Sequence, residues 1–119
     1  MKILVEQRVK TLEQLAALTR EQYQAGMATI EDYLAAEREL LEATIELAND
    51  RDARIVLLDK HVGNLKRTEA MAKERVANGV ASQAEYLRAK AARLQAEIGL
   101  ARELERGEKK EPAVSGWER

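Results

Sequence analysis

The chain has 119 residues, of which 34% are charged and 45% hydrophobic, and its net charge at pH 7 is −1. This length suits one domain, and a charge so close to zero argues against nucleic-acid binding. With no cysteine, one histidine, six glycines and one proline, the composition excludes disulfides, thiolate metal sites and turn-rich β folds. The chain is rich in Ala, Leu, Glu, Arg and Lys, a composition that favours a helical bundle or coiled coil.

The first helical segment is predicted from apolar residues that recur at alternating spacings of four and three residues. An average spacing of 3.5 residues places such side chains on one seam of a left-handed coiled coil. The series comprises Val5, Val9, Leu12, Ala16, Thr19 and Tyr23.

A turn is predicted next, near residues 26–29. Gly26 suits the position just after a helix end, where φ is positive and a Cβ would clash. Thr29 suits the N-cap of the following helix, and Asp32 could return a bond to the Thr29 N–H, as in a capping box. We therefore expect an αα-hairpin here.

The helix after this turn carries a second series at the same average spacing, which predicts another seam. Polar members of this series suggest a seam that is partly wet or faces a partner. The series comprises Glu31, Leu34, Arg38, Leu41, Ile45 and Ala48. Four glutamates of the same segment are interpreted as a solvated helix face, because a di-iron bundle would also need two Glu-x-x-His motifs. They are Glu37, Glu39, Glu42 and Glu46.

The stretch that follows leaves two alternatives open. Asn49 and Asp50 can break a helix, but neither Gly nor Pro accompanies them, and the apolar register continues across Gly63. We favour one long helix over about residues 30–78, which would place the two hairpin turns at opposite ends of the molecule. A loop near residue 50 would instead give a compact up-down four-helix bundle.

The second half of the chain repeats the first at a constant offset of 53 residues. Residues 18–48 and 71–101 align without a gap, with eleven identical positions out of 31. Glycine, hydroxyl, acidic and tyrosine residues all align, which shared helix composition alone does not explain. We therefore predict an internal duplication.

The second copy predicts the same hairpin, with a turn near residues 79–82. Gly79 is the counterpart of Gly26, Ser82 would cap the next helix, and Glu85 would be the returning acid. The corresponding seam series are Leu58, Val62, Leu65, Glu69, Ala72 and Val76 before the turn, and Ala84, Leu87, Ala91, Leu94, Ile98 and Ala101 after it.

The predicted fold class is all-α: two tandem antiparallel αα-hairpins, with the middle helices fused in the favoured alternative. One domain over residues 1–108 would hold both hairpins. Its repeats would span about residues 2–52 and 55–106.

The end of the chain differs from the repeats in composition. Gly107 and Pro112 are expected to end the last helix. We predict a flexible tail over residues 109–119, with Trp117 loosely held in it.

The pattern around each turn resembles that of the TolC family of outer-membrane efflux channels. That family carries two duplicated helical hairpins per subunit, and its turns follow R/Q-Y-x-x-G-x-x-[ST]-x-x-[DE]-[YVL]-L-x-A. Here Gln22–Ala36 and Arg75–Ala89 match it, with Val76 in place of the first tyrosine of the second copy. The likeness covers roughly residues 5–104 and concerns only the periplasmic helical hairpins of that family.

The resemblance implies a periplasmic coiled-coil element whose hairpins assemble with copies of themselves. In that family three subunits form a closed α-helical barrel, and the hairpin turns meet the hairpin tips of adaptor proteins. The residues that would contact partners are Gly26, Met27, Ala28, Thr29, Gly79, Val80, Ala81 and Ser82.

Helix capping by itself also explains most of these turn residues. Met27 and Val80 are the exceptions, because capping needs no apolar side chain at their positions, so they are the stronger contact candidates. Tyr33 and Tyr86 are interpreted as hydrophobic-staple residues rather than ligand-binding ones.

The function that we expect is therefore that of a non-catalytic interaction or assembly module, without cofactor or metal. Expected partners are copies of the chain and, as a second kind, another coiled-coil protein that resembles an adaptor. No run approaches 18 apolar residues, so we expect no transmembrane segment. The location would be the periplasm or cell envelope if an export signal lies outside this chain, and otherwise the cytoplasm. The alternative is a stand-alone cytoplasmic helical-bundle scaffold or oligomerisation domain without a role in transport.

Overall fold

The computed structural model describes the backbone of residues 1–114 and the side chains of residues 1–106. Four helices make up this part of the chain, which confirms the all-α fold class. They are α1 (Lys2–Gln24), α2 (Ile30–Leu47), α3 (Arg51–Ala77) and α4 (Gln83–Val114).

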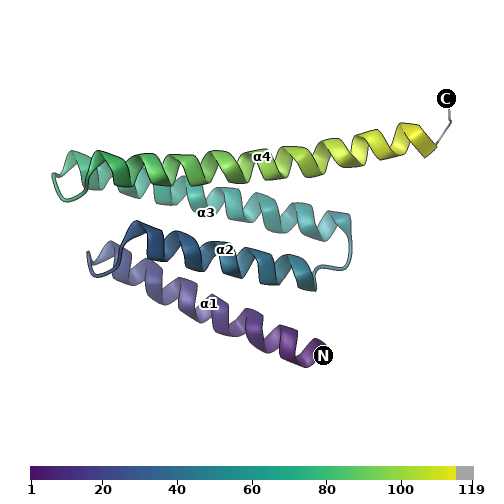
Figure 1. Ribbon diagram of the computed structural model, residues 1–119, viewed down its shortest axis with the longest axis horizontal. Coiled ribbons are helices and arrows are strands. Elements are labelled where there is room, and N and C mark those ends of the chain that lie inside the picture. Colours follow the sequence, from purple (N-terminus) through teal and green to yellow (C-terminus); the bar gives the residue numbers. More distant parts are fainter. Residues whose placement is uncertain (115–119) are drawn as a thin grey trace.

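The helices form two antiparallel hairpins, α1 with α2 and α3 with α4 (Figure 1). Helix α2 also packs against α3 and α4, whereas the backbone of α1 approaches only α2. In Figure 1, α1 and α4 form opposite edges of the array, and both hairpin turns lie at the same end. The molecule is a flat slab that measures 58 × 35 × 15 Å.

The continuous helix over residues 30–78 was the wrong alternative, and the loop near residue 50 is the one observed. Ala48 is extended, with φ −71° and ψ 135°, so the chain leaves the helical path after Leu47. Asp50 then caps α3, because its Oδ1 accepts a 2.8 Å hydrogen bond from the Ala53 N–H. An aspartate cap satisfies one of the orphan amides of a new helix, so neither glycine nor proline is needed.

The last helix extends further than expected. Helix α4 continues through Gly107 and Pro112 to Val114, so it does not end at Gly107. A glycine inside a helix costs only about 1 kcal/mol relative to alanine, which a long helix tolerates. Pro112 lies in the final turn of the helix. Trp117, which we expected to be loosely held, lies outside the residues that the structure describes.

The two seams predicted before the turns do face inward. Val9, Ala16 and Tyr23 of α1 are buried, as are Val62 and Leu65 of α3. These residues pack α1 and α3, the first helices of the two hairpins, against their neighbours. In both helices the residues at 3.5-residue spacing therefore include core residues.

The seam predicted after the second turn does not face inward. All six of its residues on α4 are exposed, from Ala84 to Ala101. The helix is rotated so that Tyr86, Ala89 and Glu103 turn inward, with Ala89 fully buried. On α2 the buried positions are likewise Tyr33 and Ala36 rather than Leu34 and Arg38 of the predicted series. In this rotation Ala89 joins Tyr23, Tyr33 and Ala72 in the core cluster near the turns, with Tyr86 packed against it.

Candidate functional site: the hairpin-tip end

The two turns share one backbone design, although their sequences differ. In the first, the Gly26 N–H donates to the Tyr23 carbonyl at 3.0 Å and the Met27 N–H donates to the Gln22 carbonyl at 2.7 Å. This pair of bonds is the Schellman motif, which closes a helix around a residue with positive φ. The second turn repeats it, with bonds of 3.0 Å from Gly79 to Val76 and 2.9 Å from Val80 to Arg75.

Both glycines have φ of 77°, as the sequence predicts. The next helix is then capped by a hydroxyl in each turn. Thr29 Oγ1 accepts a 3.0 Å bond from the Asp32 N–H, and Ser82 Oγ accepts a 3.2 Å bond from the Glu85 N–H. The return bonds expected from the two carboxylates do not occur among the hydrogen bonds of the described residues.

Two apolar side chains project from these turns. Met27 is 78% exposed and Val80 is 60% exposed. Each contributes to its Schellman motif through the backbone N–H alone, so its side chain is free for other contacts. The residues that follow them, Ala28 and Ala81, are half-buried. The fold therefore brings all eight predicted contact residues to one end of the slab (Figure 1).

A polar network behind the turns joins the two hairpins. The Tyr23 hydroxyl of α1 donates a 2.6 Å bond to Glu85 Oε2 of α4. The same oxygen accepts a 3.0 Å bond from Arg75 Nε of α3, and the guanidinium carbon lies 4.9 Å from the centre of the Tyr23 ring. The Tyr23 ring also stacks on Tyr33 of α2, with centroids 6.0 Å apart. All four helices therefore meet at this point.

Burial changes the acid-base properties of the two stacked tyrosines. Desolvation, together with the bond to Glu85, raises the pKa of Tyr23 far above its usual value of 10.0. Desolvation also raises the pKa of Tyr33, whose hydroxyl accepts a 3.3 Å bond from Thr68 Oγ1. Both phenols are therefore neutral at physiological pH and serve as fixed packing and hydrogen-bonding groups.

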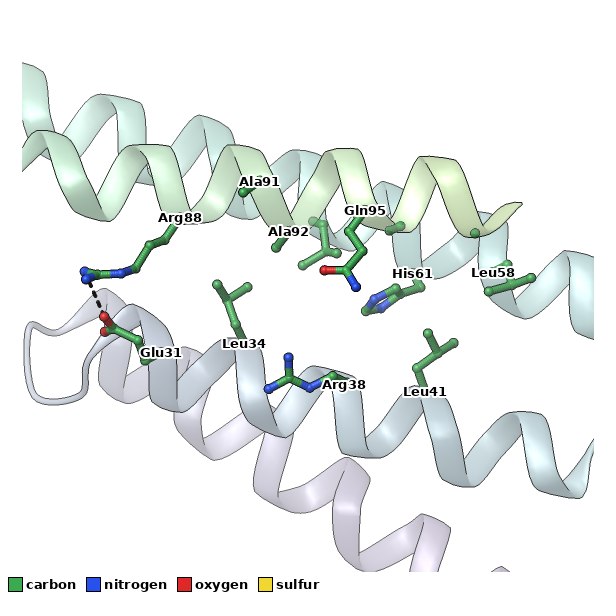
Figure 2. Close-up of a pocket in the computed structure, with 13 residues that line it drawn as sticks. Glu31, Leu34, Arg38, Leu41, Leu58, His61, Arg88, Ala91, Ala92 and Gln95 are labelled. Carbon is green, nitrogen blue, oxygen red and sulfur yellow. Dashed lines mark ion pairs between the residues drawn. The ribbon is translucent and has the colours of Figure 1, made fainter. Parts of the chain in front are cut away.

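A groove lies between the hairpins and extends along α2 and α4 from just beyond the turns (Figure 2). It measures about 440 Å³ and has α3 as its floor, with α2 and α4 as its walls. Leu34 of α2 faces Ala92 of α4 across it, and Leu41 of α2 points toward His61 and Leu58 of α3. At the end of the groove near the turns, a 2.8 Å ion pair between Glu31 and Arg88 links α2 to α4.

The groove carries few groups that could do chemistry. His61 lines it, with its Nδ1 3.8 Å from Glu37 Oε1. Glu37 is buried, so its assignment to a solvated helix face was wrong; it lies at the contact of α2 with α3, where His61 is its partner. Within the residues that the structure describes, no three His, Cys, Asp or Glu side chains gather as metal ligands would.

Two differences between the aligned repeats fall on members of the network at the turns. Tyr23 aligns with Val76 in the duplication, and Gln22 aligns with Arg75. The first copy supplies the hydroxyl of Tyr23 to the network, and the second copy supplies the guanidinium of Arg75. Differences between aligned repeats can therefore mark contacts between the repeats.

Comparisons of the chain with protein-family models, curated proteins and solved structures found no match. Within residues 1–114, none of the helices combines the length and the apolar content needed to cross a bilayer.

Proposed function

We propose that this protein is a non-catalytic interaction module that binds a partner through its two hairpin turns. The observation that carries the proposal is the exposure of Met27 and Val80 at the same end of the slab. Exposed apolar side chains on two neighbouring turns can bind another protein, because their burial releases water from both partners.

The hydrogen bonds that hold the two turns in place favour binding of a partner. A binding surface costs less entropy to order when its backbone is already fixed. Here each turn is closed by two backbone bonds and one hydroxyl cap. The bond from Tyr23 to Glu85 then fixes the two turns relative to each other.

The kind of partner follows from the resemblance of the turn motifs to those of TolC-like channels. We propose another helical hairpin of the adaptor type as the partner, in the periplasm or cell envelope, together with assembly of the chain with itself. The scaffold alternative, a cytoplasmic oligomerisation domain without a transport role, shares the self-assembly and lacks the adaptor.

The test uses the purified coiled-coil hairpin of an efflux adaptor as the probe. Binding to the full chain is measured by isothermal titration calorimetry. We expect binding by the wild type and its loss in a variant with both Met27→Ser and Val80→Ser.

Val56→Ser is the matched control, because the exposure of Val56 lies between those of Met27 and Val80 and this residue lies on α3 outside the turns. This variant should bind as the wild type does. Absence of wild-type binding, or equal binding by the double variant, would refute the adaptor proposal and leave the scaffold alternative.

A further inference from the structure

The outer surface of α4 carries a continuous apolar stripe. Leu87, Leu94 and Ile98 are 52%, 42% and 50% exposed, and three exposed alanines lie between and beyond them. The spacings alternate between three and four residues over five helical turns. The members of this α4 stripe are Ala84, Leu87, Ala91, Leu94, Ile98 and Ala101.

This regularity is the property of a coiled-coil seam. Most of the stripe has no contact inside the molecule, because α4 packs on α3 and α2 through its other side, where Ala89 and Glu103 are buried. Of the stripe residues, Ala91 alone borders the groove between α2 and α4. The opposite edge of the slab differs. On α1, Leu4, Leu15 and Leu18 are also exposed, but Arg8 and Thr11 interrupt their row.

The α4 stripe is complementary to itself when one copy is reversed. In an antiparallel pair centred between Ala92 and Arg93, Leu87 would face Ile98 of the second copy and Ala91 would face Leu94. Leu94 thus meets the small Ala91 in the two central layers, Leu87 meets Ile98 in the next two, and Ala84 meets Ala101 in the outermost two. A parallel pair would set Ala91 against Ala91 between two layers of leucine, which leaves space unfilled.

The charges beside the stripe also favour the reversed pair. Lys90 and Glu97 flank the stripe on the same side, seven residues apart. Within the chain Glu97 also pairs with Arg93 at 2.9 Å and with Lys66 at 3.9 Å, so the second copy would add to these contacts. In the antiparallel pair Lys90 of each copy would lie opposite Glu97 of the other, and Arg88 would lie opposite Gln95. No like charges would face each other, so the flanking positions support this orientation.

From this stripe we propose that the protein forms an antiparallel homodimer through α4, with the two pairs of hairpin turns at opposite ends. This inference rests on the self-assembly included in the proposed function and specifies its surface and geometry. A dimer of this kind carries two separate partner-binding ends.

The first test measures solution mass by light scattering coupled to size-exclusion chromatography. The wild type should have twice the 13.4 kDa mass of one chain, and Leu94→Asp should weaken dimerisation at least about tenfold, because a carboxylate would be buried in the seam. Val56→Asp, on an exposed position of α3, should leave the dimer intact. A monomeric wild type, or a Leu94→Asp variant with unchanged mass, overturns the proposal.

The second test addresses orientation by exchange of charges. Lys90→Glu alone and Glu97→Lys alone each place like charges across the antiparallel seam, so each variant should be monomeric. Mixed together, the two variants should form a heterodimer, since every Glu then faces a Lys. In a parallel pair Lys90 would face Gln95, so a Lys90→Glu variant that still dimerises overturns the antiparallel arrangement.

Circular dichroism of every variant separates loss of the interface from loss of the fold. The double variant Met27→Ser and Val80→Ser should retain the dimer mass, because the turns lie outside the α4 stripe. Loss of adaptor binding with the dimer retained, or the reverse, therefore distinguishes failure of the proposed function from failure of this inference.

Discussion

The hydroxyl of Tyr23 donates a 2.6 Å hydrogen bond to the carboxylate of Glu85, across 62 residues of sequence. This bond joins the first helix to the last, although the backbone of α1 approaches only α2. Arg75 binds the same carboxylate oxygen and covers the Tyr23 ring. The relative position of the two hairpins is therefore fixed at the end that carries the turns.

Removal of the Tyr23 hydroxyl should lower stability. Tyr23→Phe keeps the ring stack and deletes the bond to Glu85, and a bond to a charged group contributes about 1.5–3 kcal/mol. Because Arg75 still satisfies the carboxylate, we expect a loss of about 1 kcal/mol in the free energy of unfolding. Urea denaturation measures it. Tyr86→Phe, which leaves the network untouched, is the control, and an equal loss there would contradict the assignment.

Alkaline pH should destabilise the fold through the same residue. The pKa of Tyr23 is raised by burial and by Glu85, so its contribution is fully present below the unfolded-state pKa of 10.0 and is lost as pH rises above that value. Thermal unfolding followed from neutral to alkaline pH should show a decline above pH 10 that is smaller in Tyr23→Phe. An identical decline in both proteins would show that Tyr23 ionises freely in the folded state.

Acid should weaken a different contact, between α3 and α4. Arg93 binds both oxygens of Glu69, at 2.7 and 3.2 Å, and this holds the pKa of Glu69 below its usual 4.5. The stabilisation is present above pH 4.5 and is lost as pH falls through the lower folded-state pKa. Glu69→Gln should therefore flatten the fall of the urea midpoint below pH 4.5, whereas Glu39→Gln on the exposed face of α2 should not. A wild-type acid profile in Glu69→Gln would rule out this linkage.

Alanine in place of glycine should have opposite effects at two positions. Gly26 has φ of 77°, so Gly26→Ala should cost about 1 kcal/mol of stability. Gly99 lies inside α4 with open space where a Cβ would be, so Gly99→Ala should add about 0.5–1 kcal/mol. Thermal midpoints would shift down and up respectively. A Gly26→Ala variant as stable as the wild type would show that the turn adopts another conformation.

The turns were predictable because their causes are local. Glycine at the positive-φ position and a hydroxyl three residues later specify a helix end and a helix start within seven residues. The break after Leu47 was harder to predict, since it depends on the Asp50 cap and not on a glycine or proline. A helix could also have continued through these residues.

The rotation of α4 could not be predicted from spacing alone. That helix has two series with 3.5-residue spacing, one through Ala89 that is buried or half-buried and one through Leu94 that is exposed. The choice between them depends on contacts with distant parts of the chain, such as the bond of Arg93 to Glu69. The network of Tyr23 escaped prediction for the same reason, because its members lie far apart in sequence.

The flatness of the slab has a thermodynamic consequence. The radius of gyration is 17.2 Å, whereas a compact domain of this length would have about 13.5 Å. Folding a flat array of helices withdraws less surface from water than folding a sphere of equal mass. Because the heat-capacity change and the denaturant m value of unfolding both scale with that surface, both should be smaller than average. The curve of stability against temperature is then broad and shallow, so the free energy of unfolding changes little between cold and warm conditions.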